Sequence, residues 1–186
     1  MFIENVLILG STLLTEKVVD MARHKYNLIG YVPSKNPTIK GSIGLPIVDL
    51  NVDYDIALSI QYDSVIKNPV NCFNVHTGLL PEYGGTNILD YSIKNKEREQ
   101  GITLHKMTKK LDFGPIISKS TYPVFEGDTA YDLYKRLLCI GPNFVMAGLE
   151  LLQGLSKEEI EKCYTEKPTL YKRGEFKISK KMRELK

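Results

Sequence analysis

Two short stretches of this chain carry polar side chains whose types and spacing could do chemistry. In the first, Asn74 and His76 end an apolar run and precede a loop rich in proline and glycine. In the second, Asp112 stands in a Leu-Asp-Phe-Gly loop. A histidine can exchange a proton near neutral pH, and an asparagine amide can donate to a developing oxyanion without titrating. With a carboxylate to orient the imidazole or relay protons, these groups suit direct acyl transfer to an amine, without a serine or cysteine nucleophile.

Each residue taken alone also has a structural interpretation. A single histidine after an apolar strand is more often part of the packing, and an aspartate near a glycine is more often a turn residue. The chemical interpretation therefore depends on the three side chains lying together. Two further histidines are present: His105, which could support the site or be a hydrogen-bonded structural residue, and His24, which we assign to a helix surface.

The elements that must position these residues follow the pattern of an open α/β domain. Buried strands are predicted at 6–10, 27–32, 55–60, 72–76 and 115–123. Asn74 and His76 end the fourth apolar run, and open α/β sheets bind their ligands at the carboxyl ends of strands. Residues 101–107 alternate with period two, which predicts a strand with Thr103 and His105 on one side.

Helical spacing completes this pattern. Helices are predicted at 16–22, 88–95, 128–152 and 156–163. Gly141-Pro142 should kink or break the third of them. Only Gly10 stands in the first strand-to-helix turn, so the dinucleotide fingerprint GxGxxG is absent. We predict an α/β, Rossmann-like, mostly parallel twisted sheet with helices on both faces.

Bulk properties are those of one soluble domain. The chain has 186 residues, of which 42% are hydrophobic and 25% charged, and its three cysteines have no CxxC spacing. The odd count argues against a disulfide framework and favours a reducing compartment. Neither a signal peptide nor a long apolar run is evident, so we expect a cytoplasmic protein with no membrane segment. We also expect no metal site.

Charge divides the chain unevenly. Residues 164–186 carry eight basic side chains against three glutamates, which is +5 and leaves −2 of the net +3 for residues 1–163. We therefore expect a catalytic domain at 1–163 and a basic C-terminal extension at 164–186. The extension could meet a phosphate-bearing substrate or nucleic acid, or it could be a solvated terminus. Nucleic acid is disfavoured because aromatic residues do not interleave the basic ones.

The two stretches together resemble one enzyme family. NVHTGLLPEYGG (74–85) and GITLHKMTKKLDFGPII (101–117) closely resemble the catalytic domain of the formyltetrahydrofolate-dependent formyltransferases. The family pattern is Asn-x-His, Leu-Leu-Pro with a later Gly, Gly-x-Thr-x-His and Leu-Asp-x-Gly, and every part occurs here in order. The resemblance extends from about residue 55 to residue 137 and implies the formyltransferase fold.

The resemblance also implies roles for individual residues. Asn74, His76 and Asp112 would form the catalytic triad. N10-formyltetrahydrofolate, as co-substrate, would lie against Tyr62, Ser64, Val65, Ile66, Thr108 and Leu111. The acceptor would meet Thr77, Pro81, Tyr83, Gly85, Lys172 and Arg173.

The choice of acceptor amine is narrowed by the features in which this sequence differs from individual branches of the family. Residues 10–14 do not match the phosphate loop of the glycinamide ribonucleotide enzymes, and we expect none of the additional β-rich domain of the methionyl-tRNA enzymes. The loop at 79–87 and the ending at 169–176 are more similar to sugar N-formyltransferases, which implies a nucleotide-linked amino sugar as partner. Formylation of another small amine, hydrolysis of formyltetrahydrofolate, and a non-catalytic folate- or nucleotide-binding module remain alternatives, and a homodimer is left open.

Overall fold

The computed structural model describes residues 2–39 and 41–172. The strands of the main sheet are β1 (Asn5–Leu9), β2 (Asn27–Val32), β3 (Ile56–Ile60), β4 (Cys72–His76), β6 (Glu99–Lys106) and β7 (Ile116–Pro123). The helices are α1 (Leu13–Ala22), α2 (Ile88–Lys94), α3 (Ala130–Gly154) and α4 (Lys157–Glu161). Two short strands, β5 (Gly84–Gly85) and β8 (Leu170–Tyr171), pair with each other outside the main sheet.

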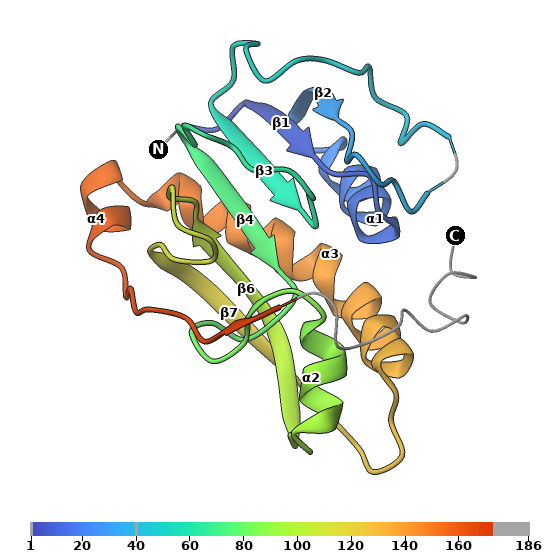
Figure 1. The fold of residues 1–186 in the computed structure, drawn as a ribbon. Coiled ribbons are helices and arrows are strands. Elements are labelled where there is room, and N and C mark those ends of the chain that lie inside the picture. Colours follow the sequence, from blue (N-terminus) through green and yellow to red (C-terminus); the bar gives the residue numbers. More distant parts are fainter. Residues whose placement is uncertain (1, 40, 173–186) are drawn as a thin grey trace.

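The main sheet is mixed and mostly parallel. Its strand order is β2-β1-β3-β4-β6-β7. Strands β2, β1, β3 and β4 run parallel, while β6 is antiparallel to both β4 and β7. The predicted α/β class and mostly parallel sheet are confirmed. The antiparallel β6 brings a second strand alongside β4, so that residues far apart in sequence face each other across one ladder (Figure 1).

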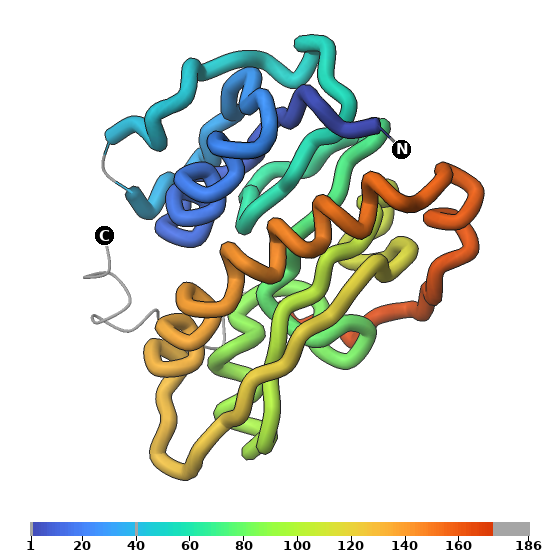
Figure 2. The backbone as a smooth tube through the Cα atoms, turned by 180° about the vertical axis from the view of Figure 1, so that it is seen from behind, coloured from blue at the N-terminus to red at the C-terminus, as the bar shows by residue number. Residues whose placement is uncertain are grey.

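The two faces of the sheet are covered differently. Alternate residues of the strands, such as Val6 and Ile8, belong to the larger core cluster that includes side chains of α1 and α3. These two helices lie on the same face, as Figure 2 shows from behind. On the opposite face Leu7 and Leu9 pack with apolar side chains of the connections around β3, including Val48. The described parts of 33–55 and 61–71 contain no helix, so loops cover this face where helices were expected.

Helix α3 runs uninterrupted through Pro142. A break was one of the two expected outcomes, but the helix continues because this part of it is fixed by packing. Gly141 lies so close to α1 that an added Cβ would be 2.7 Å from Leu14 Cδ1. Within the described residues, α3 is also the one helix long and apolar enough to cross a membrane, with a mean hydropathy of 1.3. Its apolar side chains, among them Leu133 and Val145, are buried in the larger core cluster between the helix and the sheet, so we interpret it as a core helix.

Candidate active site

The predicted polar residues gather on the loop-covered face of the sheet. Phe73 and Val75 of β4 belong to the larger core cluster, on the face that α1 and α3 cover. Asn74 and His76 alternate with them and therefore point to the other face. The register places His105 of β6 opposite Asn74, and Thr103 opposite His76. On the other side of β4, Ser59 of β3 is the partner of Asn74. Because side chains alternate between the two faces of each strand, the polar residues of β3, β4 and β6 lie side by side on one surface.

The amide of Asn74 is held at both ends. The Ser59 hydroxyl donates to Asn74 Oδ1 over 2.9 Å, and Asn74 Nδ2 lies 3.1 Å from His105 Nε2. One amide N–H is directed at His105, and the second has no hydrogen-bond partner among residues 2–39 and 41–172. Asn74 can therefore present a fixed N–H donor to a bound molecule.

The tautomer of His105 follows from its two partners. Its Nδ1 lies 3.0 Å from the carbonyl oxygen of Lys106, which can only accept, so the proton is on Nδ1. Nε2 is then the acceptor for the N–H of Asn74. The side chain is buried, and its pKa is lowered to about 4, first by burial and then by the neighbouring His76, with Asp112 acting in the opposite direction. His105 is consequently neutral at physiological pH.

His76 is oriented in the same manner. Its Nε2 lies 2.6 Å from the carbonyl oxygen of Tyr83 and must donate to it. This leaves the lone pair on Nδ1, which faces Asp112 Oδ1 at 3.6 Å. That separation is longer than a hydrogen bond, yet close enough for the carboxylate to stabilise a proton arriving on Nδ1. The arrangement is a proton acceptor with an adjacent anion.

Asp112 sits at the tip of a tightly closed loop. Its φ of +48° is left-handed, and its Oδ2 accepts the backbone N–H of Gly85 over 2.7 Å. The loop is closed where the Lys106 N–H donates to the Pro115 carbonyl over 2.8 Å. At Gly114 an added Cβ would lie 2.0 Å from the Lys106 carbonyl oxygen. The Leu-Asp-x-Gly pattern therefore has a steric cause, because only glycine permits this closure.

The loop that follows His76 is fixed by Thr103. Its hydroxyl donates to the Gly78 carbonyl over 2.7 Å and accepts the Leu80 N–H over 3.1 Å. The Leu80–Pro81 peptide bond is cis. The Thr of the Gly-x-Thr-x-His pattern thus ties β6 to the loop, while the His of that pattern holds Asn74.

The residues expected to contact the folate lie in two segments on the same face as Asn74. Tyr62 and Ile66 pack against the cluster that contains Cys72, and so does Met107 at the start of the Asp112 loop. Val65 and Leu111 are 90% and 62% exposed. Ser64 is half-buried, and the Thr108 hydroxyl is bonded within its own loop. Their role as a folate site stays a prediction.

The residues expected to contact the acceptor are more dispersed. Thr77 and Pro81 are half-buried, and Lys172 is exposed. Tyr83 has a buried ring stacked on Tyr171, with a centroid separation of 5.1 Å. The groups that residues 83 and 85 direct toward the triad are backbone atoms. Arg173 lies outside the described residues, and the assignment of these residues to the acceptor remains a prediction.

Sequence reasoning missed Ser59 and the backbone groups of residues 83–85. Ser59 is the one polar residue within the apolar run Ile56–Ile60, and this interruption could have identified it. The backbone contacts could not be predicted in this way, because a carbonyl or N–H is present at almost every position.

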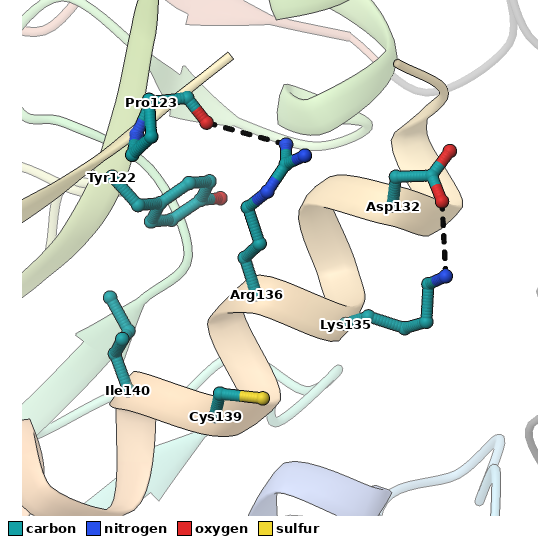
Figure 3. A pocket seen from close by; sticks show the side chains of 7 residues that line it. All are labelled: Tyr122, Pro123, Asp132, Lys135, Arg136, Cys139 and Ile140. Atoms are coloured by element: carbon teal, nitrogen blue, oxygen red, sulfur yellow. Dashed lines mark hydrogen bonds and ion pairs between the residues drawn. The ribbon is translucent and has the colours of Figure 1, made fainter. Parts of the chain in front are cut away.

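A cavity of about 450 Å³ lies away from this site, between the end of β7 and the first half of α3 (Figure 3). Its lining includes Tyr122, Cys139 and Ile140. Its charged side chains are already bound: the Arg136 guanidinium to Pro123 and Asp128, and the Lys135 ammonium to Asp132. This cavity offers no proton-transfer group comparable to His76.

Comparison with known proteins shows which family the sequence belongs to. Residues 35–149 match the family described as formyl transferase, a range that includes Asn74, His76 and Asp112. The chain belongs to the formyl transferase family. Membership confirms the family resemblance of the two sequence stretches.

Curated relatives of this chain come from several bacteria. The bifunctional polymyxin resistance protein ArnA of Wigglesworthia glossinidia brevipalpis is 38% identical over 98 residues, covering 50% of this chain and 15% of that protein. The methionyl-tRNA formyltransferase of Thermosipho melanesiensis is 33% identical over 136 residues, covering 71% of this chain and 43% of that protein. The matches thus span less than half the length of these relatives.

Two solved structures resemble this chain over almost all of its length. WlaRD, a sugar 3N-formyl transferase crystallised in the presence of dTDP and 5-N-formyl-THF, is 22% identical with a TM-score of 0.77, covering 100% of this chain and 78% of that one. The N-formyltransferase of Helicobacter canadensis, in complex with folinic acid and dTDP-3-aminofucose, is 18% identical with a TM-score of 0.78, covering 98% and 78%. These likenesses establish the fold.

Proposed function

We propose that this chain transfers a formyl group from N10-formyltetrahydrofolate to the primary amine of a nucleotide-linked amino sugar. One observation carries the proposal: an N–H of Asn74 that has no partner among the described residues shares a face of the sheet with a proton-accepting His76 Nδ1 and the Asp112 carboxylate. Amine formylation needs a donor for the oxygen that becomes negative and an acceptor for the proton that the amine loses.

Each step of the reaction has a group in this chain. The amine attacks the formyl carbon, and the Asn74 N–H stabilises the charge developing on the formyl oxygen. His76 Nδ1 accepts the proton from the attacking nitrogen, and Asp112 stabilises the imidazolium. When the bond between the formyl carbon and N10 breaks, the same proton is returned to N10. Water is kept from the reacting groups because the side chains of His76 and Asp112 are almost fully buried.

The formyl donor is proposed to cover the apolar side chains beside the triad. Val65 and Leu111 are unusually exposed for their type, and they lie next in sequence to Ile66, which packs on the loop-covered face, and to Asp112. An aromatic pterin bound between them would bury this apolar surface. The two structural neighbours named above were crystallised with 5-N-formyl-THF and with folinic acid, which supports a folate as the formyl donor.

The sugar assignment has support from the first turn of the fold. Ser11 and Thr12 are buried at the start of α1, and their hydroxyls bond the Ser34 N–H and the Thr15 side chain and N–H. Segment 34–38 is also bonded to this turn through Thr38. The turn therefore leaves little access for a ribonucleotide phosphate, whereas the neighbours in complex with dTDP and dTDP-3-aminofucose point to a nucleotide-linked acceptor.

The direct test is a formyl-transfer assay. The full chain is incubated with N10-formyltetrahydrofolate and a panel of thymidine diphosphate 3-amino and 4-amino sugars, and the acceptor is examined by mass spectrometry for one added formyl group. His76→Ala should reduce transfer about 10²–10⁴-fold, as expected for loss of a general base. His24→Ala, which removes an exposed histidine, is the matched control and should be fully active.

The possible outcomes separate the alternatives. Formylation of glycinamide ribonucleotide instead of any amino sugar would overturn the sugar assignment and keep the chemistry. Formate released without an acceptor would indicate a hydrolase. Folate binding without turnover of any amine would indicate a binding module and contradict the proposal.

A further inference from the structure

Two members of the triad are held by backbone atoms of a single short segment. The Tyr83 carbonyl accepts from His76 Nε2 over 2.6 Å, and the Gly85 N–H donates to Asp112 Oδ2 over 2.7 Å. A backbone group cannot change rotamer, so its position is set by the path of the chain around it. Whatever fixes residues 83–85 therefore also fixes the His76 tautomer and the Asp112 carboxylate.

Residues 83–85 are fixed from the far end of the chain. Strand β8 pairs in parallel with β5. The Thr169 N–H donates to the Pro81 carbonyl over 2.9 Å, the Gly84 N–H to the Thr169 carbonyl over 2.9 Å, and the Thr86 N–H to the Tyr171 carbonyl over 3.0 Å. These bonds are made on both sides of the two groups that touch the triad.

Glycine permits this close approach. Gly85 has a φ of +92°, and an added Cβ would lie 2.1 Å from the Tyr171 carbonyl oxygen. At Gly84 an added Cβ would lie 3.0 Å from side-chain atoms of Pro168 and Leu170. The Gly-Gly pair therefore fits β8 closely, which gives it a structural reason independent of any acceptor.

The side chain of Tyr171 adds a second connection. Its ring stacks on Tyr83 at 5.1 Å and 13°, and its centroid lies 4.3 Å from that of Tyr91. Asn95 Nδ2 donates to the hydroxyls of both Tyr83 (2.8 Å) and Tyr171 (3.2 Å), and the Tyr83 hydroxyl donates to Glu97. The ring of Tyr83 is thus held by Tyr171 while its carbonyl orients His76.

We propose that strand β8, with Tyr171 as its anchor, is a positioning element for catalysis. It acts on the reaction through the Tyr83 carbonyl and the Gly85 N–H, which orient His76 and Asp112, and it touches neither reacting molecule. The inference rests on the proposed formyl transfer for its kinetic readout, but it also predicts a property of the ligand-free protein, the tautomer of His76.

The experiment compares Tyr171→Ala with wild type in the full chain. We expect kcat to fall about 10- to 100-fold with KM for the folate nearly unchanged, because displacement of a catalytic group by about 1 Å can cost about 10²-fold. In the folded, ligand-free protein, ring ¹⁵N NMR should show the single Nε2–H tautomer of His76 in wild type and a mixture in the variant. The chain has three histidines, which makes the assignment practical.

Three further variants make the test decisive. Tyr171→Phe keeps the stacked ring and should restore both kcat and the tautomer. Tyr164→Ala removes an exposed tyrosine from the same segment and should resemble wild type. Should Tyr171→Ala fail to fold, Thr169→Pro removes a single backbone donor to Pro81 and is expected to give the same two changes. A folded Tyr171→Ala or Thr169→Pro with unaltered kcat and a pure Nε2–H tautomer would overturn the inference. A wild-type chain without formyl transfer would instead reject the proposed function, and the tautomer comparison would still test the role of β8.

Discussion

Acid should destabilise this protein through His105. Its pKa is lowered from 6.5 to about 4, with burial as the largest cause, whereas in the unfolded chain the imidazole titrates normally. Between these two pKa values the unfolded state binds more protons than the folded state. The stabilising contribution of neutral His105 is therefore complete above pH 6.5 and is lost as the pH falls toward 4. The whole difference corresponds to about 3 kcal/mol in the free energy of unfolding.

The assay is urea unfolding of wild type and His105→Gln at several pH values between about 8 and about 5. A glutamine amide oxygen can still accept the Asn74 N–H, but it does not titrate. Carboxylates whose pKa values are lowered, such as those of Asp55 and Asp128, contribute similarly to both proteins. Wild type should therefore lose about 2 kcal/mol more than the variant over this range, with two thirds of the full difference developed by about pH 5.

Parallel stability curves for the two proteins would refute the reasoning. That result would mean that His105 has a similar pKa in the folded and unfolded states. The ring that faces Asn74 would then not be kept neutral by burial. His24→Gln is the control, because this histidine is exposed, and its curve should follow that of wild type.

Two other substitutions test how the triad is held. Ser59→Ala removes the donor to Asn74 Oδ1, and we expect kcat to fall about 2- to 10-fold, the effect of one hydrogen bond of about 0.5–1.5 kcal/mol; a change confined to KM would contradict this role. Gly114→Ala places a Cβ 2.0 Å from the Lys106 carbonyl oxygen, so it should destabilise the protein by about 1–3 kcal/mol in urea unfolding and reduce activity through Asp112. Gly154→Ala, where an added Cβ meets nothing within 4 Å, is the control, and equal stability of the two alanine variants would argue against a strained loop closure.

Much of the framework could be predicted because it depends on side-chain periodicity. The apolar runs at 27–32 and 72–76 are strands with those bounds, and the alternation of 102–105 placed Thr103 and His105 together on one side of a strand. The apolar runs hold because the central strands are covered on both faces, whereas 102–105 alternates because Ile102 and Leu104 enter the core and Thr103 and His105 point to the polar face. The capped starts of α3 and α4, at Thr129 and Ser156, were likewise visible as helix signals.

Other features could not be predicted because no residue type encodes them. The reversal of direction between β4 and β6 depends on the path of the whole chain, as does the placement of α1 and α3 on one face. Continuation of α3 through Pro142 depends on packing, which outweighs local propensity. The contacts of Tyr83 and Gly85 with the triad use backbone atoms, so the sequence suggested an acceptor-facing role where the structure records a link to β8 and the triad.

The hydrogen bonds that hold Asn74 have a consequence for selectivity. The Ser59 hydroxyl donates to the Asn74 amide, the amide donates to the His105 ring, and the ring donates to the Lys106 carbonyl, which only accepts. Turning the amide over would point its oxygen at the lone pair of His105 Nε2, and His105 cannot switch tautomer without abandoning Lys106. Asn74 Nδ2 can therefore bond a ligand oxygen that accepts, and it cannot accept from a ligand N–H. Side chains of β3, β4 and β6, together with the Lys106 carbonyl, thus fix a donor that can bind an acyl oxygen and cannot bind an N–H.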